Sequence, residues 1–185
     1  MAIFGITGTP GTGKKSIAPM VAKRLTAQCI SLNDLARSYG LVRGASGDVD
    51  VDKLRSRLRR SLPRDAVVYG HLLPYVLDSS AVAKVVVLRC EPGALKERLR
   101  ERGYEPKKII EDVEAELIGV VSSDAFDAYG RERTWEVDTT RTTPGEAAAS
   151  VSRIAMGAVR PARRIDWTLD YDSGAKLRLL LSVSV

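Results

Sequence analysis

Short apolar runs alternate with helical patterns along most of this chain. The apolar runs predict buried strands over residues 2–7, 28–32, 66–69, 83–88 and 134–138. Apolar positions at helical spacing predict helices between them, over residues 13–27, 33–38, 51–62, 92–102, 107–129 and 144–158. Strands that alternate with helices form parallel sheets with right-handed crossovers. We therefore expect an α/β fold, with a five-stranded parallel sheet and helices on both faces.

The pattern changes near residue 159. A basic stretch there is followed by two segments, residues 165–171 and 177–185, in which apolar and polar residues alternate around a turn at 172–174. Alternation on both sides of a turn predicts a β-hairpin. We therefore divide the chain into a domain over residues 1–158 and a basic, hairpin-like extension over 159–185, which packs on the domain or on a partner.

A glycine-rich turn follows the first predicted strand and precedes the first predicted helix. Its sequence, Gly8-Thr9-Pro10-Gly11-Thr12-Gly13-Lys14, fits the phosphate-binding pattern G-x-x-x-x-G-K. Glycines let backbone N–H groups converge on a polyphosphate, and the N-terminus of the following helix adds partial positive charge. Lys14 is placed to reach the β- and γ-phosphates. This P-loop predicts binding of a nucleoside triphosphate, with ATP as the expected ligand.

One position departs from that pattern. The serine or threonine that usually follows the lysine and holds Mg²⁺ is replaced by Lys15, and Ser16 comes one residue later. Nucleoside monophosphate kinases often carry the hydroxyl one position later, so Ser16 is one candidate ligand. The alternative is that metal binding is weakened. We favour the first interpretation and expect Mg²⁺ to be required together with ATP.

Further stretches combine into a pattern that spans residues 2–167. They are Asn33-Asp34-Leu35-Ala36-Arg37, residues 48–54, Gly70-His71-Leu72, residues 98–104 with Lys107-Lys108, residues 137–140 with Pro144, and Ile165-Asp166-Trp167. Together with the P-loop, these stretches resemble the adenylate kinase isoenzyme 6 family of archaea and eukaryotic nuclei. The resemblance implies a P-loop nucleoside triphosphate hydrolase fold with two short insertions: a monophosphate-binding region near residues 33–62 and a lid near residues 98–108.

The same resemblance implies an activity and partners. It indicates an adenylate kinase that transfers the γ-phosphoryl group of ATP to AMP or another nucleoside monophosphate, with ATPase activity. It also implies a role in small ribosomal subunit maturation, with a ribosomal protein of the uS11 type and pre-ribosomal RNA as partners. By resemblance, Lys14, His71, Arg98 and Arg102 are catalytic. Residues 8–16, Arg102, Thr139 and Thr140 bind ATP, and the acceptor contacts Asp34, Arg37, Gly70 and His71.

Two residues differ from the family pattern. Tyr69 stands where many relatives carry an aspartate before Gly-His, and Pro74 replaces a second histidine. Both differences bear on catalytic rate, so a second function stays open: an ATP-driven ribosome assembly factor with only incidental kinase activity. A third is a P-loop kinase for another small metabolite.

Composition agrees with an anionic ligand and an intracellular location. The net charge is +6, and several arginines lie in the predicted helix 51–62, where they form a solvated face or contact RNA or a phosphate. No apolar run is long enough to span a membrane, and no signal peptide is evident at the N-terminus. We expect Cys29 and Cys90 to be buried reduced thiols and the protein to be cytoplasmic, from an archaeal source, without a membrane partner.

Overall fold

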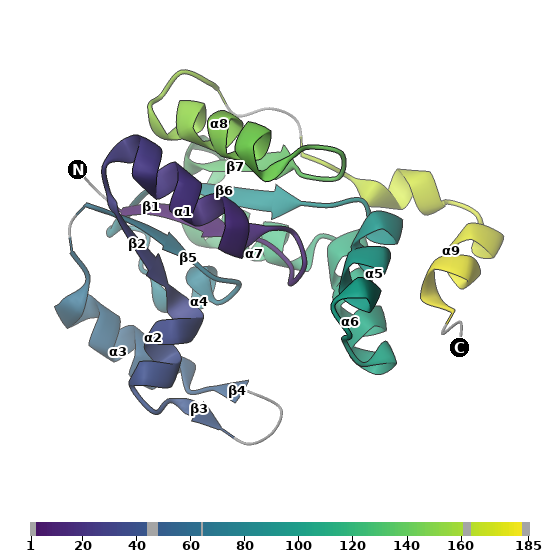
Figure 1. Ribbon diagram of the computed structural model, residues 1–185, viewed down its shortest axis with the longest axis horizontal. Coiled ribbons are helices and arrows are strands. Elements are labelled where there is room, and N and C mark those ends of the chain that lie inside the picture. The colour runs from purple at the N-terminus through teal and green to yellow at the C-terminus, as the bar shows by residue number, and fades with distance from the viewer. Residues whose placement is uncertain (1–2, 44–47, 64, 161–163, 183–185) are drawn as a thin grey trace.

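The computed structural model describes residues 3–43, 48–63, 65–160 and 164–182. Its centre is a five-stranded sheet of order β2-β5-β1-β6-β7, in which every neighbouring pair is parallel (Figure 1). All five strands were predicted, and their bounds are β1 Ile3–Thr7, β2 Gln28–Ser31, β5 Ala66–Tyr69, β6 Val82–Arg89 and β7 Thr134–Asp138. The central strands β1, β5 and β6 are rich in apolar residues and β1 is buried along its whole length, as expected for the interior of a parallel sheet.

Helices cover both faces of the sheet, as predicted (Figure 1). On one face, α1 (Lys14–Leu25) and α8 (Pro144–Ala155) pack on apolar side chains of the central strands. On the other face lie α4 (Leu73–Val76) and α7 (Val120–Tyr129). The parallel strands end at one edge of the sheet. The loops that follow β1, β5 and β6 therefore meet there.

Two groups of elements flank the carboxyl edge of the sheet. One consists of α2 (Leu32–Ser38), α3 (Val51–Ser61) and an antiparallel ladder of β3 (Val42–Arg43) with β4 (Asp48–Val49), where no strand was predicted. The other consists of α5 (Pro92–Glu101), α6 (Pro106–Leu117) and α9 (Gly174–Leu181). They lie on opposite sides of the molecule in Figure 1 and include the residues at which the two insertions were expected.

Two details of the helices differ from the predictions. A single helix over 107–129 was predicted, but the chain breaks at Gly119, whose φ of 69° is a left-handed conformation that glycine adopts without strain. The helix predicted from residue 33 begins at Leu32. Its N-cap is Ser31, whose hydroxyl accepts a hydrogen bond from the backbone N–H of Asp34.

The predicted C-terminal hairpin is wrong. Residues Trp167–Tyr171 form a 3₁₀ helix, η2, and α9 follows it. Both helices have side-chain caps, from Asp166 and Ser173, and Leu177, Leu180 and Leu181 also match helical spacing. This face packs against α5 and α6, so the helix is stabilised by burial. Val183 and Val185, part of the predicted second strand, lie outside the described residues.

The two cysteines differ in exposure. Cys90 is buried, as predicted, but Cys29 is exposed because it lies on β2, the edge strand of the sheet. Leu54 and Leu58, which are four residues apart on α3, are buried and face the core. Among the described residues, none of the helices combines the length and apolar character needed to cross a membrane.

Two adjacent leucines provide a direct test of the packing of α9. Leu180 is 5% exposed and Leu179 is 74% exposed. We expect Leu180→Ala to lower the free energy of unfolding by about 2–3 kcal/mol, because it leaves a cavity against α5 and α6. Leu179→Ala should change it by less than about 0.5 kcal/mol. Urea denaturation measures both, and equal effects of the two substitutions would contradict the described helix.

Candidate nucleotide-binding site

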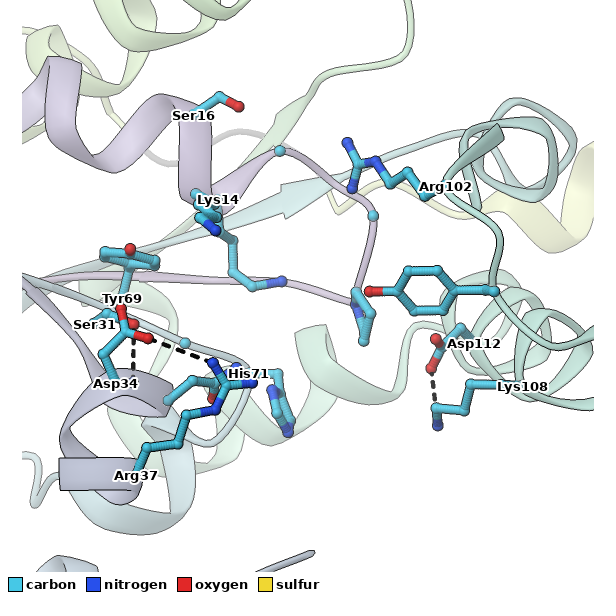
Figure 2. Close-up of a pocket in the computed structure, with 17 residues that line it drawn as sticks. Lys14, Ser16, Ser31, Asp34, Arg37, Tyr69, His71, Arg102, Lys108 and Asp112 are labelled. Atoms are coloured by element: carbon cyan, nitrogen blue, oxygen red, sulfur yellow. Dashed lines mark hydrogen bonds and ion pairs between the residues drawn. The ribbon is translucent and has the colours of Figure 1, made fainter. Parts of the chain in front are cut away.

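A pocket of about 400 Å³ opens at the carboxyl edge of the sheet (Figure 2). Four segments line it: the P-loop, the start of α2, the end of β5, and the turn between α5 and α6 with the start of α6. The lining residues are Pro10, Gly11, Gly13, Lys14, Lys15, Ser16, Ser31, Asn33, Asp34, Arg37, Tyr69, Gly70, His71, Arg102, Tyr104, Lys108 and Asp112. Most of the residues predicted for the two phosphate sites therefore meet in one cavity.

The P-loop wraps tightly at the end of β1. A Cβ atom on Gly8 would lie 2.4 Å from the carbonyl oxygen of Leu88, so only glycine fits this close approach to β6. Gly13, with a φ of 101°, is the N-cap of α1 and has no side chain to occupy the unpaired N–H groups of the first turn. The loop therefore presents backbone donors and a helix N-terminus to the pocket, as an anion site requires.

The ammonium group of Lys14 lies inside this loop. It donates hydrogen bonds to the carbonyl oxygens of Gly8 at 2.5 Å and Thr9 at 2.9 Å. Burial, with a smaller contribution from Arg102, lowers the pKa of Lys14 to about 8, against the opposing effect of Glu116 and Asp112. The site thus concentrates cationic groups at low solvation, and a polyphosphate would supply the negative charge that stabilises them.

Beneath the loop lies a buried ion network that the sequence did not reveal. The guanidinium of Arg89, at the end of β6, donates to Glu116 at 2.8 Å and to Glu136 at 2.5 Å, and all three side chains are at most 3% exposed. The second oxygen of Glu116 accepts a hydrogen bond of 2.5 Å from the hydroxyl of Thr9. This contact fixes the P-loop to α6.

The side of the pocket that α2 and the end of β5 form is more open. Asp34 and Arg37 form an exposed ion pair with 3.7 Å between nitrogen and oxygen. His71 follows Gly70 at the end of β5 and lies between Arg37 and the α5–α6 side in Figure 2. Burial, together with the positive charges of Lys14 and Lys108, lowers the pKa of His71 to about 4. Its imidazole is therefore neutral at pH 7 and acts as a hydrogen-bonding group without charge.

The α5–α6 side of the pocket includes one acid that the sequence analysis missed. Arg102 and Tyr104 lie in the turn after α5, and Lys108 and Asp112 lie on α6. One oxygen of Asp112 pairs with the ammonium of Lys108 at 3.2 Å. Its other oxygen is buried and has no hydrogen-bond partner among the described residues. The spacing of Lys108, Asp112 and Glu116 is that of one helix face, which was the only available sign of this arrangement.

Several predicted site residues lie outside the pocket. Arg98 donates to the carbonyl oxygens of Thr139 at 2.7 Å and Thr140 at 2.8 Å, and the hydroxyl of Thr139 donates to the carbonyl of Thr12 at 3.0 Å. These contacts join α5 and the end of β7 to the back of the P-loop. Gly8, Thr9 and Thr12 form the inner side of the loop, and they do not line the cavity.

Comparisons with known proteins agree on the fold and the family. Residues 5–119 match the family model described as an AAA domain. A protein of Pyrococcus abyssi named "Putative adenylate kinase" is 40% identical over 174 residues, covering 92% of this chain and 93% of that protein. A protein of Halobacterium salinarum with the same name is 36% identical over 172 residues, covering 90% of this chain and 97% of that protein.

Solved structures support the architecture at greater evolutionary distance. Shikimate kinase from Acinetobacter baumannii, in complex with shikimate, aligns with a TM-score of 0.62 at 14% identity and covers 85% of this chain and 94% of that one. Shikimate kinase from Bacteroides thetaiotaomicron aligns with a TM-score of 0.56 at 16% identity. At such identity the likeness shows the fold alone, and it confirms the predicted P-loop α/β fold.

The buried network makes a clear prediction about stability. Replacing Arg89 by leucine leaves Glu116 and Glu136 as buried carboxylates without their counter-ion. We expect this substitution to lower the free energy of unfolding by about 3–5 kcal/mol, measured by urea denaturation.

Arg100→Leu is the matched control, since Arg100 pairs with Glu97 on the surface at 3.4 Å. Its effect should stay below about 1 kcal/mol. Comparable small effects for both variants would show that the Arg89 network does not hold the fold together.

Proposed function

This chain belongs to the AAA-domain family and to the family of the archaeal proteins named above, and we propose that it is a nucleoside monophosphate kinase that transfers the γ-phosphoryl group of ATP to AMP. The observation that carries this proposal is the shared pocket. The P-loop with Lys14 and the acceptor side with Arg37 and His71 open onto the same cavity. Such an arrangement suits in-line transfer between two bound phosphates.

On the donor side, the chain supplies positive charge at fixed positions. Lys14 and the loop N–H groups would hold the β- and γ-phosphates, and Arg102 faces them from the lid. Phosphoryl transfer needs positioning and charge neutralisation more than covalent help. In this structure the ammonium group of Lys14 donates hydrogen bonds to the carbonyl oxygens of Gly8 and Thr9. When ATP binds, its phosphate oxygens would replace these carbonyl oxygens as acceptors.

On the acceptor side, Arg37 is the expected phosphate ligand. Its side chain is 72% exposed and its pairing with Asp34 is loose, so it is free to turn toward an incoming monophosphate. A guanidinium binds a phosphate through two parallel hydrogen bonds. The neutral His71 beside it can donate or accept one more hydrogen bond. AMP as the acceptor rests on the names of the relatives, and another small metabolite is the alternative.

The residues present fit Mg²⁺ as a companion of ATP. No group of three or more histidine, cysteine or acidic side chains is arranged to hold a metal among the described residues. Mg²⁺ in kinases typically keeps several waters and binds through substrate phosphates and only one or two protein groups. Ser16, which lines the pocket at the start of α1, would supply the hydroxyl ligand. The bound ion would neutralise charge on the transferred phosphoryl group.

A second candidate function is an ATP-driven ribosome assembly factor, which the resemblance to the isoenzyme 6 family suggests. Tyr69 in place of an acid fits slow ATP hydrolysis. However, the arginines of α3 engage their own chain: Arg55 bonds the carbonyl of Tyr75, Arg57 stacks on Tyr39 and Arg59 pairs with Asp78. These contacts within the chain favour a structural role for the arginines of α3 over RNA binding. Either activity needs ATP, and the cytoplasm is the location that we propose.

The test is the formation of ADP from ATP and Mg²⁺ with and without AMP. We expect AMP to accelerate ADP formation strongly. Arg37→Ala should lower kcat/KM for AMP by about 10- to 100-fold, because it removes a charged hydrogen-bonding group worth about 1.5–3 kcal/mol. Arg24→Ala, at the exposed end of α1, is the control and should leave kcat/KM unchanged.

Each other result selects an alternative. Slow ADP formation at a rate that does not depend on AMP would point to the assembly factor. A pull-down with a ribosomal protein of the uS11 type would then test that function. Activity with a different acceptor in a panel of hydroxyl compounds would point to the third function. Full turnover in excess EDTA would exclude the requirement for Mg²⁺.

A further inference from the structure

One buried carboxylate in the pocket has an oxygen atom that accepts no hydrogen bond from the described residues. Asp112 has a side chain that is 6% exposed, and its Oδ1 atom pairs with Lys108 at 3.2 Å. Its Oδ2 atom is buried with no hydrogen-bond partner among the described residues, although Asp112 lines the pocket. An unpaired buried carboxylate oxygen is costly, so native proteins pair such atoms with protein, water or ligand. A ligand of the pocket is therefore expected to supply the missing donor.

The chemistry of the pocket restricts that donor. Phosphate oxygens at neutral pH are anionic acceptors and would repel a carboxylate at contact distance. A hydroxyl group or a water molecule can donate, and water bound to a divalent cation donates strongly because the metal polarises it. Figure 2 shows Asp112 across the pocket from Asp34 and Arg37, on the same side as Arg102, and its negative charge raises the pKa of Lys14 in the P-loop. The donor therefore belongs to the triphosphate side.

The position of Asp112 is fixed relative to the P-loop. Glu116 lies four residues later on the same face of α6, and it accepts hydrogen bonds from Thr9 of the loop and from Arg89 beneath it. The α6 helix therefore cannot shift against the loop without breaking this buried network. On the preceding turn, Lys108 offsets part of the negative charge of Asp112. These contacts hold the free oxygen of Asp112 at a constant place beside the phosphate cradle.

We propose that Asp112 is a positioning residue that accepts a hydrogen bond from a water molecule in the coordination shell of the Mg²⁺ bound to ATP. It would thereby perform, from α6, the task of the acid that is absent at Tyr69 on β5. The inference rests on the proposed function, because it requires MgATP in this pocket. It adds a protein contact to a metal that Ser16 alone would otherwise hold.

Nucleotide binding without turnover tests the proposal. The probe is an ATP analogue with a non-hydrolysable imido bridge between the β- and γ-phosphates, titrated calorimetrically with Mg²⁺ or with EDTA. Wild-type protein should bind the analogue more tightly with Mg²⁺. In Asp112→Asn, the ratio of the affinity with Mg²⁺ to the affinity in EDTA should be about tenfold smaller than in the wild-type protein, because the amide is a weaker acceptor for a metal-bound water. The affinity in EDTA should stay unchanged.

Glu111→Gln is the matched control. Glu111 is the exposed neighbour of Asp112 on α6 and also contacts Lys108, at 3.3 Å, but it does not line the pocket. It should retain the full Mg²⁺-dependent gain. Circular dichroism checks the fold of each variant, and Asp112→Ser, which removes the charge and keeps a small polar group, replaces Asp112→Asn if the latter does not fold.

The possible results separate the two proposals. An unchanged Mg²⁺-dependent gain in Asp112→Asn overturns the role of Asp112, and so does an equal loss of affinity with Mg²⁺ and with EDTA, which would indicate a structural residue. If wild-type protein does not bind the analogue under either condition, the proposed function itself fails. If wild-type protein binds the analogue equally well in both conditions, Mg²⁺ has no place in the site and the role of Asp112 is overturned with it.

Discussion

The guanidinium of Arg89 joins the segments of the chain that meet at the pocket. From the end of β6 it reaches Glu116 on α6 and Glu136 on β7, with all three side chains almost completely buried. A buried charge is tolerated only when it is paired and hydrogen-bonded, so these three residues fix one another. Because Glu116 also binds Thr9, the P-loop takes its position from this network.

The same network includes the C-terminal segment. The backbone N–H of Ile165 donates to Glu136 at 2.6 Å, and the indole N–H of Trp167 donates to Glu116 at 3.3 Å. The C-terminal extension, which the sequence analysis separated from the domain, therefore helps to hold the P-loop in position. The helix α6, the P-loop and the C-terminal segment share one buried anchor, and the exposed pair of Asp34 and Arg37 lies outside it. This division suits the proposed kinase, in which a rigid site would hold ATP and a more adaptable site would hold the acceptor.

Local signals in the sequence predicted the sheet and the P-loop, and they did so for physical reasons. Continuous apolar runs such as β1 have few alternatives to a buried parallel strand, and the spacing of glycines and Lys14 has a specific geometric meaning. The hairpin prediction failed because Leu177, Leu179 and Leu181 alternate while Leu177, Leu180 and Leu181 also fit a helix. Packing against α5 and α6 decided between these patterns.

Long-range contacts escaped prediction. Thr9 and Glu116 are 107 positions apart, and on an acidic helix Glu116 and Asp112 resemble ordinary surface residues. Only the fold shows that both are buried beside the loop.

Binding of a bisubstrate analogue, two adenosines joined by five phosphates, tests most directly whether one pocket holds both a donor and an acceptor phosphate. Calorimetric titration should give one analogue per chain, and the bound analogue should block binding of both ATP and AMP. An analogue that competes with ATP but leaves AMP binding unchanged would contradict the account, because the two nucleotides would then occupy separate places.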